Sequence, residues 1–400
     1  MRKLIFAALY FLPVLAFSFP TQLANAANAN QNVAISTRSE GGISYQVIHY
    51  PKGTFFLNKT LSIGSNTIVE GEGSGTKLVP MPKNFGGAQF VSNSDYRNGN
   101  SNIKLRNLKI EFSQKLVKGD NPGIVRFQNV NNLSIENITM TGRSDMYFID
   151  LAASCRNVAL SGCSISNMGG GCLMLRNQDS APSKASYAVQ ISGNSFVSGM
   201  GDEPVAVFGW LGDVHGVQVS NNRVDGSHSS FGIAAYGIDK PTDTGTLYDV
   251  TISGNTVTGG KFGGIAVKGG ASRVTVSKNV VSATTNDGIF LHTGGASLPV
   301  ASSVTITGNT LTAIGRHGIF ATGSDIVVSG NSITNCGQSG VYVGDNVQVV
   351  SNTISNAAPG ILVEGTVNRV VKSNTLTNAI INVLNNDWAG ITDNVVRHVP

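Results

Sequence analysis

From about residue 100 onward, short apolar runs alternate with turns that contain Gly and Asn. The phrase VTISGNTVT (250–258) is followed by GGIAVKGG (263–270), and variants of both recur along the chain. Apolar residues at every second position predict β-strands with one face turned inward. Each unit therefore predicts a strand, a tight turn at Asn, a second strand, a variable loop and a third strand of the form G-I-x-V-x-G.

The position of the turn residue marks each unit, so the spacing between successive turn residues gives the length of the units. Aligned through the chain, it gives the series Asn107, Asn137, Cys163, Asn194, Asn222, Asn255, Asn279, Asn309, Asn331, Asn352, Asn374 and Asn394. A repeat of this kind, rich in β-branched residues, is typical of a solenoid, because a single coil cannot bury its apolar face alone. We predict an all-β solenoid of about 11 to 12 coils, in which stacked Asn side chains form a hydrogen-bonded ladder.

This repeat resembles the right-handed parallel β-helix, or pectin-lyase-like, superfamily. The passage YPKGTFFLNKTLSIGSNTIVEGEGSGTKL (50–78) is similar to the opening of that fold, in which P-x-G-x-aromatic leads into the first coils. The resemblance implies a single-stranded right-handed parallel β-helix, with a cap and first coils at 27–100 and, at 101–400, coils that have extended loops in the middle of the helix. It implies no single reaction, because the fold carries lyases, hydrolases, epimerases and adhesins.

The segment 1–26 predicts a secretory signal. Arg2 and Lys3 precede the apolar run LIFAALYFLPVLAF, and ANA at 24–26 fits the small-x-small cleavage pattern. We expect a secreted or periplasmic protein with a bacterial Sec-type signal and no membrane anchor. Removal of the signal lowers the number of Lys and Arg residues from 28 to 26, against 23 acidic residues, which gives a net charge of +3. The sequence contains no run of basic residues that would favour binding to nucleic acid.

The coils differ in length. Asn222 and Asn255 are 33 residues apart, whereas Asn374 and Asn394 are 20 apart. The additional residues of the middle coils follow the G-I-x-V-x-G strand, at 177–188, 210–216, 238–249 and 294–302. Loops that leave one edge of a solenoid sheet can form the wall of a groove, so we predict a groove across the middle coils.

Outward positions of the third strand carry the candidate chemistry. In GGIAVKGG, Ile265 and Val267 are predicted to point inward and Lys268 outward. The same register predicts an outward row that contains Asp150, Arg176, Phe208, Tyr236, Lys268 and His292. A second row, two residues before the first inward position, contains Asp145, Glu203, Asp287 and His317.

Hydrolysis of a glycosidic bond would use the acidic residues, because it needs two carboxyl groups beside the scissile bond. GDEPVAV (201–207) looks like the G-D-D-x-I-A-I motif of polygalacturonase-type β-helix hydrolases. That resemblance implies Asp202 or Glu203 as the general acid, and Asp145 as the nearest equivalent of the third carboxylate. The G-H-G and R-x-K motifs of that group are absent. Trp210, after the strand, is a predicted platform for the apolar face of a sugar.

β-Elimination would use the basic residues, and its substrate would be a uronic acid polymer. Lys268 and His292 are the base candidates, with Tyr236 one coil away, and Arg176 would hold the substrate carboxylate. This arrangement resembles the chondroitinase-B and alginate lyase group. The acidic calcium ligands of that group are missing, since Phe262-Gly263-Gly264 precedes the Lys. The D-P-H-D motif of mannuronan epimerases is not found.

We predict a secreted enzyme that cleaves an acidic polysaccharide, with elimination favoured narrowly over inverting hydrolysis. Uronate epimerisation is a third reaction open to this fold, and a surface β-helix that only binds polysaccharide is its non-enzymatic counterpart. The predicted catalytic residues are Lys268, His292, Arg176, Asp150, Asp202 and Glu203, and the predicted substrate-binding residues are Tyr236, Phe208, Trp210, Asp145, Asp287 and His317. We expect a monomer, identify no metal ligands, and leave Ca²⁺ open as a cofactor.

Overall fold

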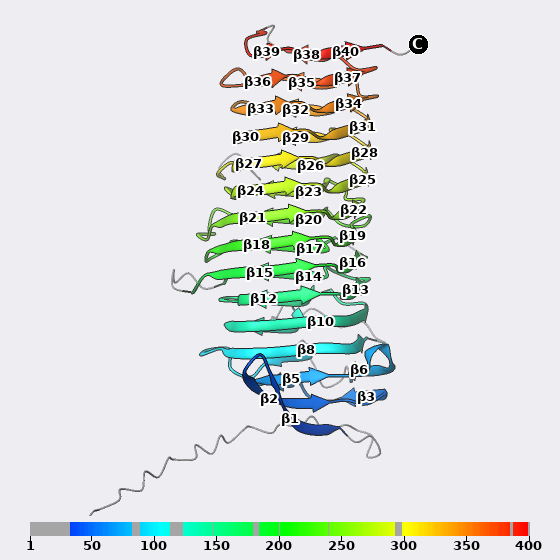
Figure 1. The fold of residues 1–400 in the computed structure, drawn as a ribbon, viewed down its shortest axis with the longest axis vertical. Coiled ribbons are helices and arrows are strands. Elements are labelled where there is room, and N and C mark those ends of the chain that lie inside the picture. The colour runs from blue at the N-terminus through cyan, green and yellow to red at the C-terminus, as the bar shows by residue number, and fades with distance from the viewer. Residues whose placement is uncertain are drawn as a thin grey trace, which may run out of the picture.

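The computed structural model describes residues 33–81, 89–112, 123–145, 147–178, 184–199, 201–238, 240–292, 298–384 and 387–398. The predicted signal at 1–26 therefore lies outside the described residues. The described strands wind into a single column of stacked coils, with β1 (Ala34–Glu40) at one end and β40 (Val395–Arg397) at the other (Figure 1). No described helix is long and apolar enough to cross a membrane.

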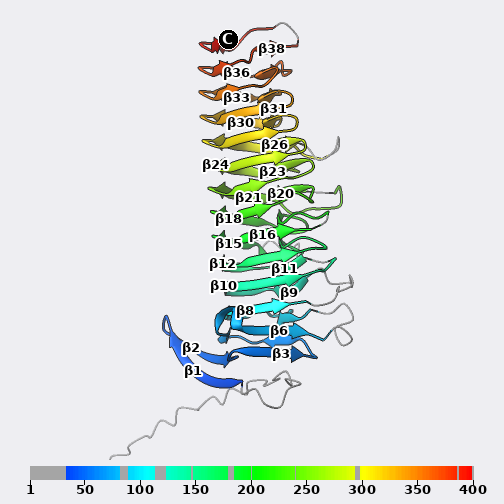
Figure 2. The same ribbon diagram turned by 90° about the vertical axis from the view of Figure 1, so that its right-hand side faces the viewer.

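One coil consists of three strands, as β18 (Val214–Ser220), β19 (Arg223–Asp225) and β20 (Phe231–Tyr236) show. Strands at the same place in successive coils pair in parallel, so ladders run the length of the column (Figure 2). The third strand of each coil joins a 13-stranded sheet, which carries the site described below. Its members are β4 (Leu61–Ile63), β7 (Val91–Asn93), β9 (Gly123–Gln128), β11 (Tyr147–Ala152), β14 (Leu173–Arg176), β17 (Val205–Phe208), β20, β23 (Gly263–Lys268), β26 (Asp287–His292), β29 (Ile319–Ala321), β32 (Val341–Val343), β35 (Ile361–Val363) and β38 (Ile381–Val383).

The first and second strands of the coils form two further ladders. Both pass through the long strands β8 (Asn100–Glu111) and β10 (Val130–Gly142), which unite them into one 27-stranded sheet. The first ladder adds β2 (Ile43–His49), β5 (Thr67–Glu70), β12 (Arg156–Ser161), β15 (Ser186–Ser192), β18, β21 (Leu247–Ser253), β24 (Ser272–Ser277), β27 (Ser302–Thr307), β30 (Ser324–Ser329), β33 (Val347–Val350), β36 (Val370–Lys372) and β39 (Ile391–Thr392). The second adds β3 (Gly53–Leu57), β6 (Thr76–Pro80), β13 (Ser164–Asn167), β16 (Ser195–Ser198), β19, β22 (Thr256–Thr258), β25 (Val280–Thr284), β28 (Thr310–Ile314), β31 (Ser332–Cys336), β34 (Thr353–Ser355), β37 (Thr375–Thr377) and β40.

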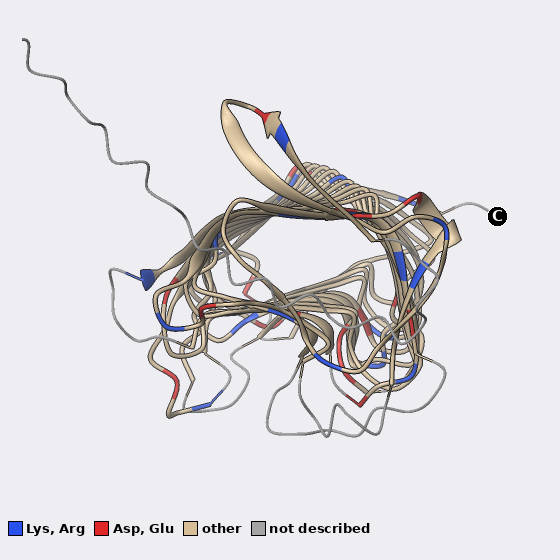
Figure 3. Cartoon of the chain, turned by 90° about the horizontal axis from the view of Figure 1, so that it is seen from below, with Lys and Arg blue, Asp and Glu red and all other residues tan. Residues whose placement is uncertain are grey.

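An antiparallel hairpin marks the amino-terminal end of the column. Strands β1 and β2 pair antiparallel, and seen along the axis the hairpin stands outside the ring of coils (Figure 3). Its charged side chains form a network with the next coils, in which Glu70 accepts hydrogen bonds from Arg38 and Arg106 at 2.7–3.1 Å. These guanidinium groups lower the pKa of Glu70 to about 2.

The core is one continuous apolar column inside the coils. The inward residues of the three strands are Ile, Val, Leu and Phe with almost no exposure, as for Ile265 and Val267. All four cysteines are buried free thiols. The single core confirms the predicted inward register for most coils.

The predicted asparagine ladder is present in the later coils. From Asn194 to Asn394, each Asn side chain donates to the Oδ1 of the next at 2.9–3.0 Å. Cys163 occupies the preceding position, and its backbone N–H donates to Asn194. Asn107 and Asn137 do not belong to the ladder as aligned above, because Leu108 and Ile138 are paired at its level. They occupy the left-handed turn position one residue earlier, with φ of 56° and 53°.

Candidate functional site

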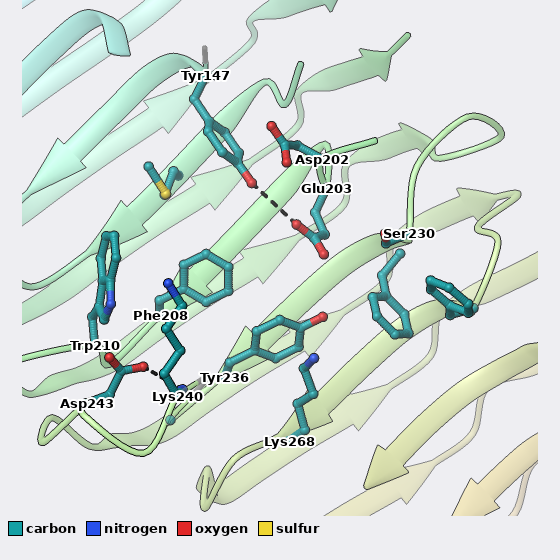
Figure 4. Close-up of a pocket in the computed structure, with 14 residues that line it drawn as sticks. Tyr147, Asp202, Glu203, Phe208, Trp210, Ser230, Tyr236, Lys240, Asp243 and Lys268 are labelled. Atoms are coloured by element: carbon teal, nitrogen blue, oxygen red, sulfur yellow. Dashed lines mark hydrogen bonds between the residues drawn. The ribbon is translucent and has the colours of Figure 1, made fainter. Parts of the chain in front are cut away.

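A cleft of about 420 Å³ opens on the outer face of the 13-stranded sheet, over β11, β14, β17, β20 and β23. Its walls are formed by residues before β17, β20 and β23 and by the loops after β17 and β20. Of the loops predicted to border a groove, 210–216 and 238–249 therefore contribute to the walls. It is lined by Tyr147, Met174, Asp202, Glu203, Phe208, Trp210, Ser230, Phe231, Tyr236, Gly237, Lys240, Asp243, Phe262 and Lys268 (Figure 4). Six of the twelve predicted site residues are therefore in one place: Asp202, Glu203, Phe208, Trp210, Tyr236 and Lys268.

Small residues on the sheet give these large side chains room. Ala206, Ala234 and Ala266 are paired cross-strand neighbours and are fully buried. The rings of Phe231 and Tyr236 pack with Ala234 and Ala266, and Ala206 packs with Tyr147 and Met174. Because an outward alanine occupies little space, neighbouring aromatic rings can lie across it, which gives the cleft an aromatic lining.

The acidic end of the cleft, which carries the carboxylate side chains, contains Tyr147, Asp202 and Glu203. The hydroxyl of Tyr147 donates to Oε2 of Glu203 at 3.3 Å, and the two side chains point toward each other in Figure 4. Burial, and next the charge of Asp202, raises the pKa of Glu203, whereas Lys268 and Tyr147 oppose the rise. A carboxyl group of this kind retains its proton to higher pH than an exposed Glu, as a general acid requires.

Glycine at position 171 makes this contact sterically feasible. A Cβ atom there would lie 2.2 Å from the ring of Tyr147 and 2.6 Å from the carbonyl oxygen of Glu203. Any larger residue would push the phenol away from the carboxyl group. Tyr147 itself is 8% exposed, and burial, followed by the charges of Glu203 and Asp202, raises its pKa well above the usual value.

The opposite end of the cleft is aromatic and basic. The rings of Phe208 and Tyr236 are stacked with centroids 5.1 Å apart, and Nζ of Lys268 lies 3.9 Å from the centroid of Tyr236. The loop after β20 supplies Lys240 and Asp243, whose carboxylate accepts the backbone N–H of Lys240 at 2.9 Å. In Figure 4 these two residues and Trp210 lie across the cleft from Asp202 and Glu203.

Asp150 and Arg176 lie beneath the surface. The guanidinium of Arg176 donates two hydrogen bonds of 2.9 Å to Asp150, and the side chains are 3% and 0% exposed. Asp150 pairs with Met174, so it does not share a row with Arg176, and that part of the predicted register is wrong. The register was misassigned because an inward pair of Tyr147 and Ile149 fits the apolar alternation as well as an inward pair of Ile149 and Leu151 does. With its carboxylate partner in place, Arg176 is not presented to a substrate carboxylate.

The remaining predicted site residues lie outside the cleft. Asp287 is fully buried and accepts a hydrogen bond of 2.9 Å from Nε of Arg316. His317 is 6% exposed, and its Nδ1 is 2.6 Å from the hydroxyl of Ser339. His292 is stacked on Phe290, with centroids 5.4 Å apart. Asp145 belongs to the turn before β11, and none of the four lines the cleft.

Tyr147 is a site residue that the sequence pattern did not reveal, as are Lys240 and Asp243. It pairs with Gly123 and takes the edge position that was assigned to Asp145. The signal was available, because aligning Ile149 and Leu151 with Val205 and Val207 moves the whole strand by two residues and brings Tyr147 beside Glu203. The described part of the chain has no cluster of three or more His, Cys, Asp or Glu side chains suited to a metal ion.

Comparison with known families gives the same architecture. A model of the right-handed β-helix region matches residues 151–323 and 242–396, more than half of the chain. The chain belongs to the right-handed β-helix family. This confirms the predicted fold class and the resemblance on which it was based. No curated protein sequence matches the chain.

Solved right-handed β-helix structures are similar in fold at low identity. The N-terminal fragment of bacteriophage phi29 gene product 12 has a TM-score of 0.65 at 17% identity, covering 83% of this chain and 62% of that one. The A-module of mannuronan C-5 epimerase AlgE4 from Azotobacter vinelandii has a TM-score of 0.51 at 12% identity, covering 89% and 87%. A variant tailspike protein of E. coli bacteriophage HK620, in complex with a pentasaccharide, has a TM-score of 0.54 at 15% identity, covering 88% and 72%. The chain thus spans about three fifths of the phi29 fragment.

Proposed function

We propose that this β-helix binds a polysaccharide in the cleft and hydrolyses a glycosidic bond there, with Glu203 as the general acid. The observation that carries the proposal is the half-buried Glu203 carboxyl group with a raised pKa, next to Asp202, in a cleft lined by aromatic rings. Two solved structures of similar fold, a mannuronan epimerase and a tailspike with a bound pentasaccharide, have names that concern sugars, which supports the substrate class.

The acidic end of the cleft supplies the groups that transfer protons. In hydrolysis, Glu203 gives its proton to the glycosidic oxygen as the bond to the anomeric carbon breaks. Asp202 is exposed and lines the same cleft, so it is the candidate base that accepts a proton from the attacking water. Tyr147 holds the Glu203 side chain by its hydrogen bond. The aromatic end binds the apolar faces of neighbouring sugars.

Elimination stays a second candidate because Lys268 lines the same cleft. Its ammonium group is a suitable partner for a uronate carboxylate. In elimination, a base removes the C5 proton of the uronate, the electron pair left behind forms the C4–C5 double bond, and the C4–O bond breaks as the leaving oxygen takes up a proton. The prediction of this reaction was based on four basic or aromatic residues: Arg176, Tyr236, Lys268 and His292. Arg176 and His292 do not line the cleft, so two of the four no longer support the reaction. Hydrolysis is therefore the better supported reaction.

The proposal is tested with the purified chain and a panel of polysaccharides: polygalacturonate, alginate, chondroitin sulfate, and neutral glucans and galactans. One assay measures reducing ends, and a second measures the ultraviolet absorbance of unsaturated uronate ends. Reducing ends without absorbance are expected. Both signals together would establish elimination. Binding to one polymer with neither signal would make this β-helix a binding protein. A cleavable extracellular polymer would also agree with export by the predicted signal at 1–26.

A further inference from the structure

The buried Asp150–Arg176 pair lies against the aromatic end of the cleft. Two hydrogen bonds of 2.9 Å fix the plane of the Arg176 guanidinium on the carboxylate of Asp150. The central carbon of that guanidinium is 4.7 Å from the centroid of the Trp210 ring. An arginine held in this way is a rigid flat surface, which a lysine ammonium could not replace.

The backbone of Trp210 is held as tightly as its ring. Its φ is 49°, and it is the only aromatic residue among the described left-handed positions. Its carbonyl oxygen accepts hydrogen bonds from the N–H groups of Thr244 and Gly245, at 3.0 and 2.6 Å. A bulky residue adopts this conformation where its surroundings enforce it, and such residues cluster at ligand sites. The loop after β20 thus anchors the Trp210 backbone while Arg176 supports its ring.

We propose that the Asp150–Arg176 pair positions the Trp210 ring and thereby forms a sugar-binding subsite at the end of the cleft away from Glu203. This inference rests on the proposed function, which supplies a polysaccharide ligand, and it narrows that ligand to a uronate-containing oligosaccharide. Lys240 lines the same end of the cleft, and an ammonium group there suits an acidic sugar. Asp150 and Arg176 are then positioning residues that act through Trp210.

The position of the subsite implies a dependence on chain length. Glu203 and Phe208 are five residues apart along β17 and its entry, roughly 17 Å of extended chain, and Trp210 follows beyond that strand. An oligosaccharide that reaches from Glu203 to Trp210 must therefore contain several sugars. A disaccharide at Glu203 would not contact Trp210, whereas an octasaccharide would.

The first experiment reads the position of Trp210 without a ligand. The chain has two tryptophans, and Trp388 is 53% exposed, so Trp388→Phe leaves Trp210 as the only tryptophan. In that background, Arg176→Met should shift Trp210 emission to longer wavelength and weaken its near-ultraviolet circular dichroism. Arg316→Met is the matched control, because Arg316 also pairs with a buried aspartate and lies 5.3 Å from an aromatic ring, that of Phe320. If Arg176→Met does not fold, Arg176→Lys keeps a charge beside Asp150 and removes only the flat support.

The second experiment titrates oligogalacturonides and oligomannuronates, each as disaccharide and octasaccharide, into the Glu203→Gln form of the chain. Trp210→Ala and Arg176→Met should each weaken octasaccharide binding about tenfold, the usual effect of one aromatic contact. The double variant should bind no more weakly than Trp210→Ala alone, because Arg176 acts through that ring. Disaccharide affinity should not change.

The outcomes separate this inference from the proposed function. Unchanged Trp210 emission in Arg176→Met overturns the positioning role, whatever sugar is bound. A shifted emission with equal octasaccharide affinity in all forms overturns the subsite. Additive losses in the double variant show that Arg176 acts independently of Trp210, which also overturns the proposal. Binding losses as expected, in a chain that hydrolyses none of these polymers, support the subsite and contradict only the reaction.

Discussion

Two stretches of the 13-stranded sheet differ sharply on the same outward row. In β17, β20 and β23 the row contains Ala206, Ala234 and Ala266, whereas in β29, β32 and β35 it contains Phe320, Tyr342 and Leu362. Over the alanines, large neighbouring side chains lie across the sheet and line a cleft. In the later coils Phe320 and Tyr342 stack directly on each other, with centroids 4.4 Å apart.

The stacked rings of the later coils are poorly suited to bind sugars. Rings stacked at an interplanar angle of 13° cover each other's faces and turn their edges outward. A sugar binds against an aromatic face, which Trp210 can offer to the cleft but a stacked ladder cannot. The apolar core beneath both stretches is the same. The difference teaches that the inward positions maintain the coil, whereas outward residue size and loop length decide whether a coil carries a site.

The largest expected effect comes from removing the proton donor of the cleft. Glu203→Gln keeps the shape of the side chain but cannot transfer a proton, so turnover should fall at least 100-fold, roughly the lower end for a general acid. Affinity for the polysaccharide should stay within about twofold, since the aromatic lining is intact. Initial rates of reducing-end formation and a binding isotherm measure the two quantities.

The later coils provide the control for this variant. Glu364 is an exposed carboxylate next to β35, far along the same sheet, and Glu364→Gln should leave turnover unchanged. Equal losses in both variants, or none in Glu203→Gln, would show that the cleft does not hold the acid.

The next effect comes from making the cleft resemble the later coils. Ala266→Phe places at β23 the residue that its partner strand β26 carries at Phe290. The new ring must displace Tyr236 or Phe231, which costs about 1–3 kcal/mol for overpacking. Polysaccharide binding should weaken more than tenfold while the fold persists. Isothermal titration and urea unfolding measure these two changes, and retained affinity would mean that the alanine row does not shape the site.

The fold was predictable because many residues repeat the same information. Inward pairs of Ile and Val recur in each regular coil. In the ladder from Asn194 to Asn394, the same Asn turn recurs, and its side chains hydrogen-bond to one another from coil to coil. The strand at Tyr147 was misplaced by two residues because an apolar residue with a polar tip suits either register. The role of Arg176 was not predicted, although Asp150 stood beside it in the predicted outward row, because that row treated both side chains as open to a substrate and not as a buried pair.

A smaller effect concerns the pH dependence of the acid. The Tyr147 hydroxyl donates to the carboxylate of Glu203 and so favours its charged form, which lowers the Glu203 pKa. Tyr147→Phe removes this hydrogen bond and raises that pKa. Because hydrolysis needs the protonated acid, the rate falls as pH rises through the pKa, and the alkaline limb of the profile should move to higher pH. The pH–rate profile measures this shift, with Tyr342→Phe as the control. A downward shift would contradict the assignment of Glu203.

The smallest expected effect is at His292, between the two stretches. Its ring is stacked on Phe290 and does not line the cleft. Burial, followed by the charges of Lys268 and Arg316, lowers the pKa of His292, so the imidazole is neutral at neutral pH and adds no charge to the site. In a hydrolase, His292→Ala should therefore change the rate of cleavage less than about twofold at neutral pH. A loss of more than about tenfold in the rate of cleavage, with products that absorb in the ultraviolet, would instead indicate that His292 acts as a base. The substrate-binding surface would then extend toward the later coils.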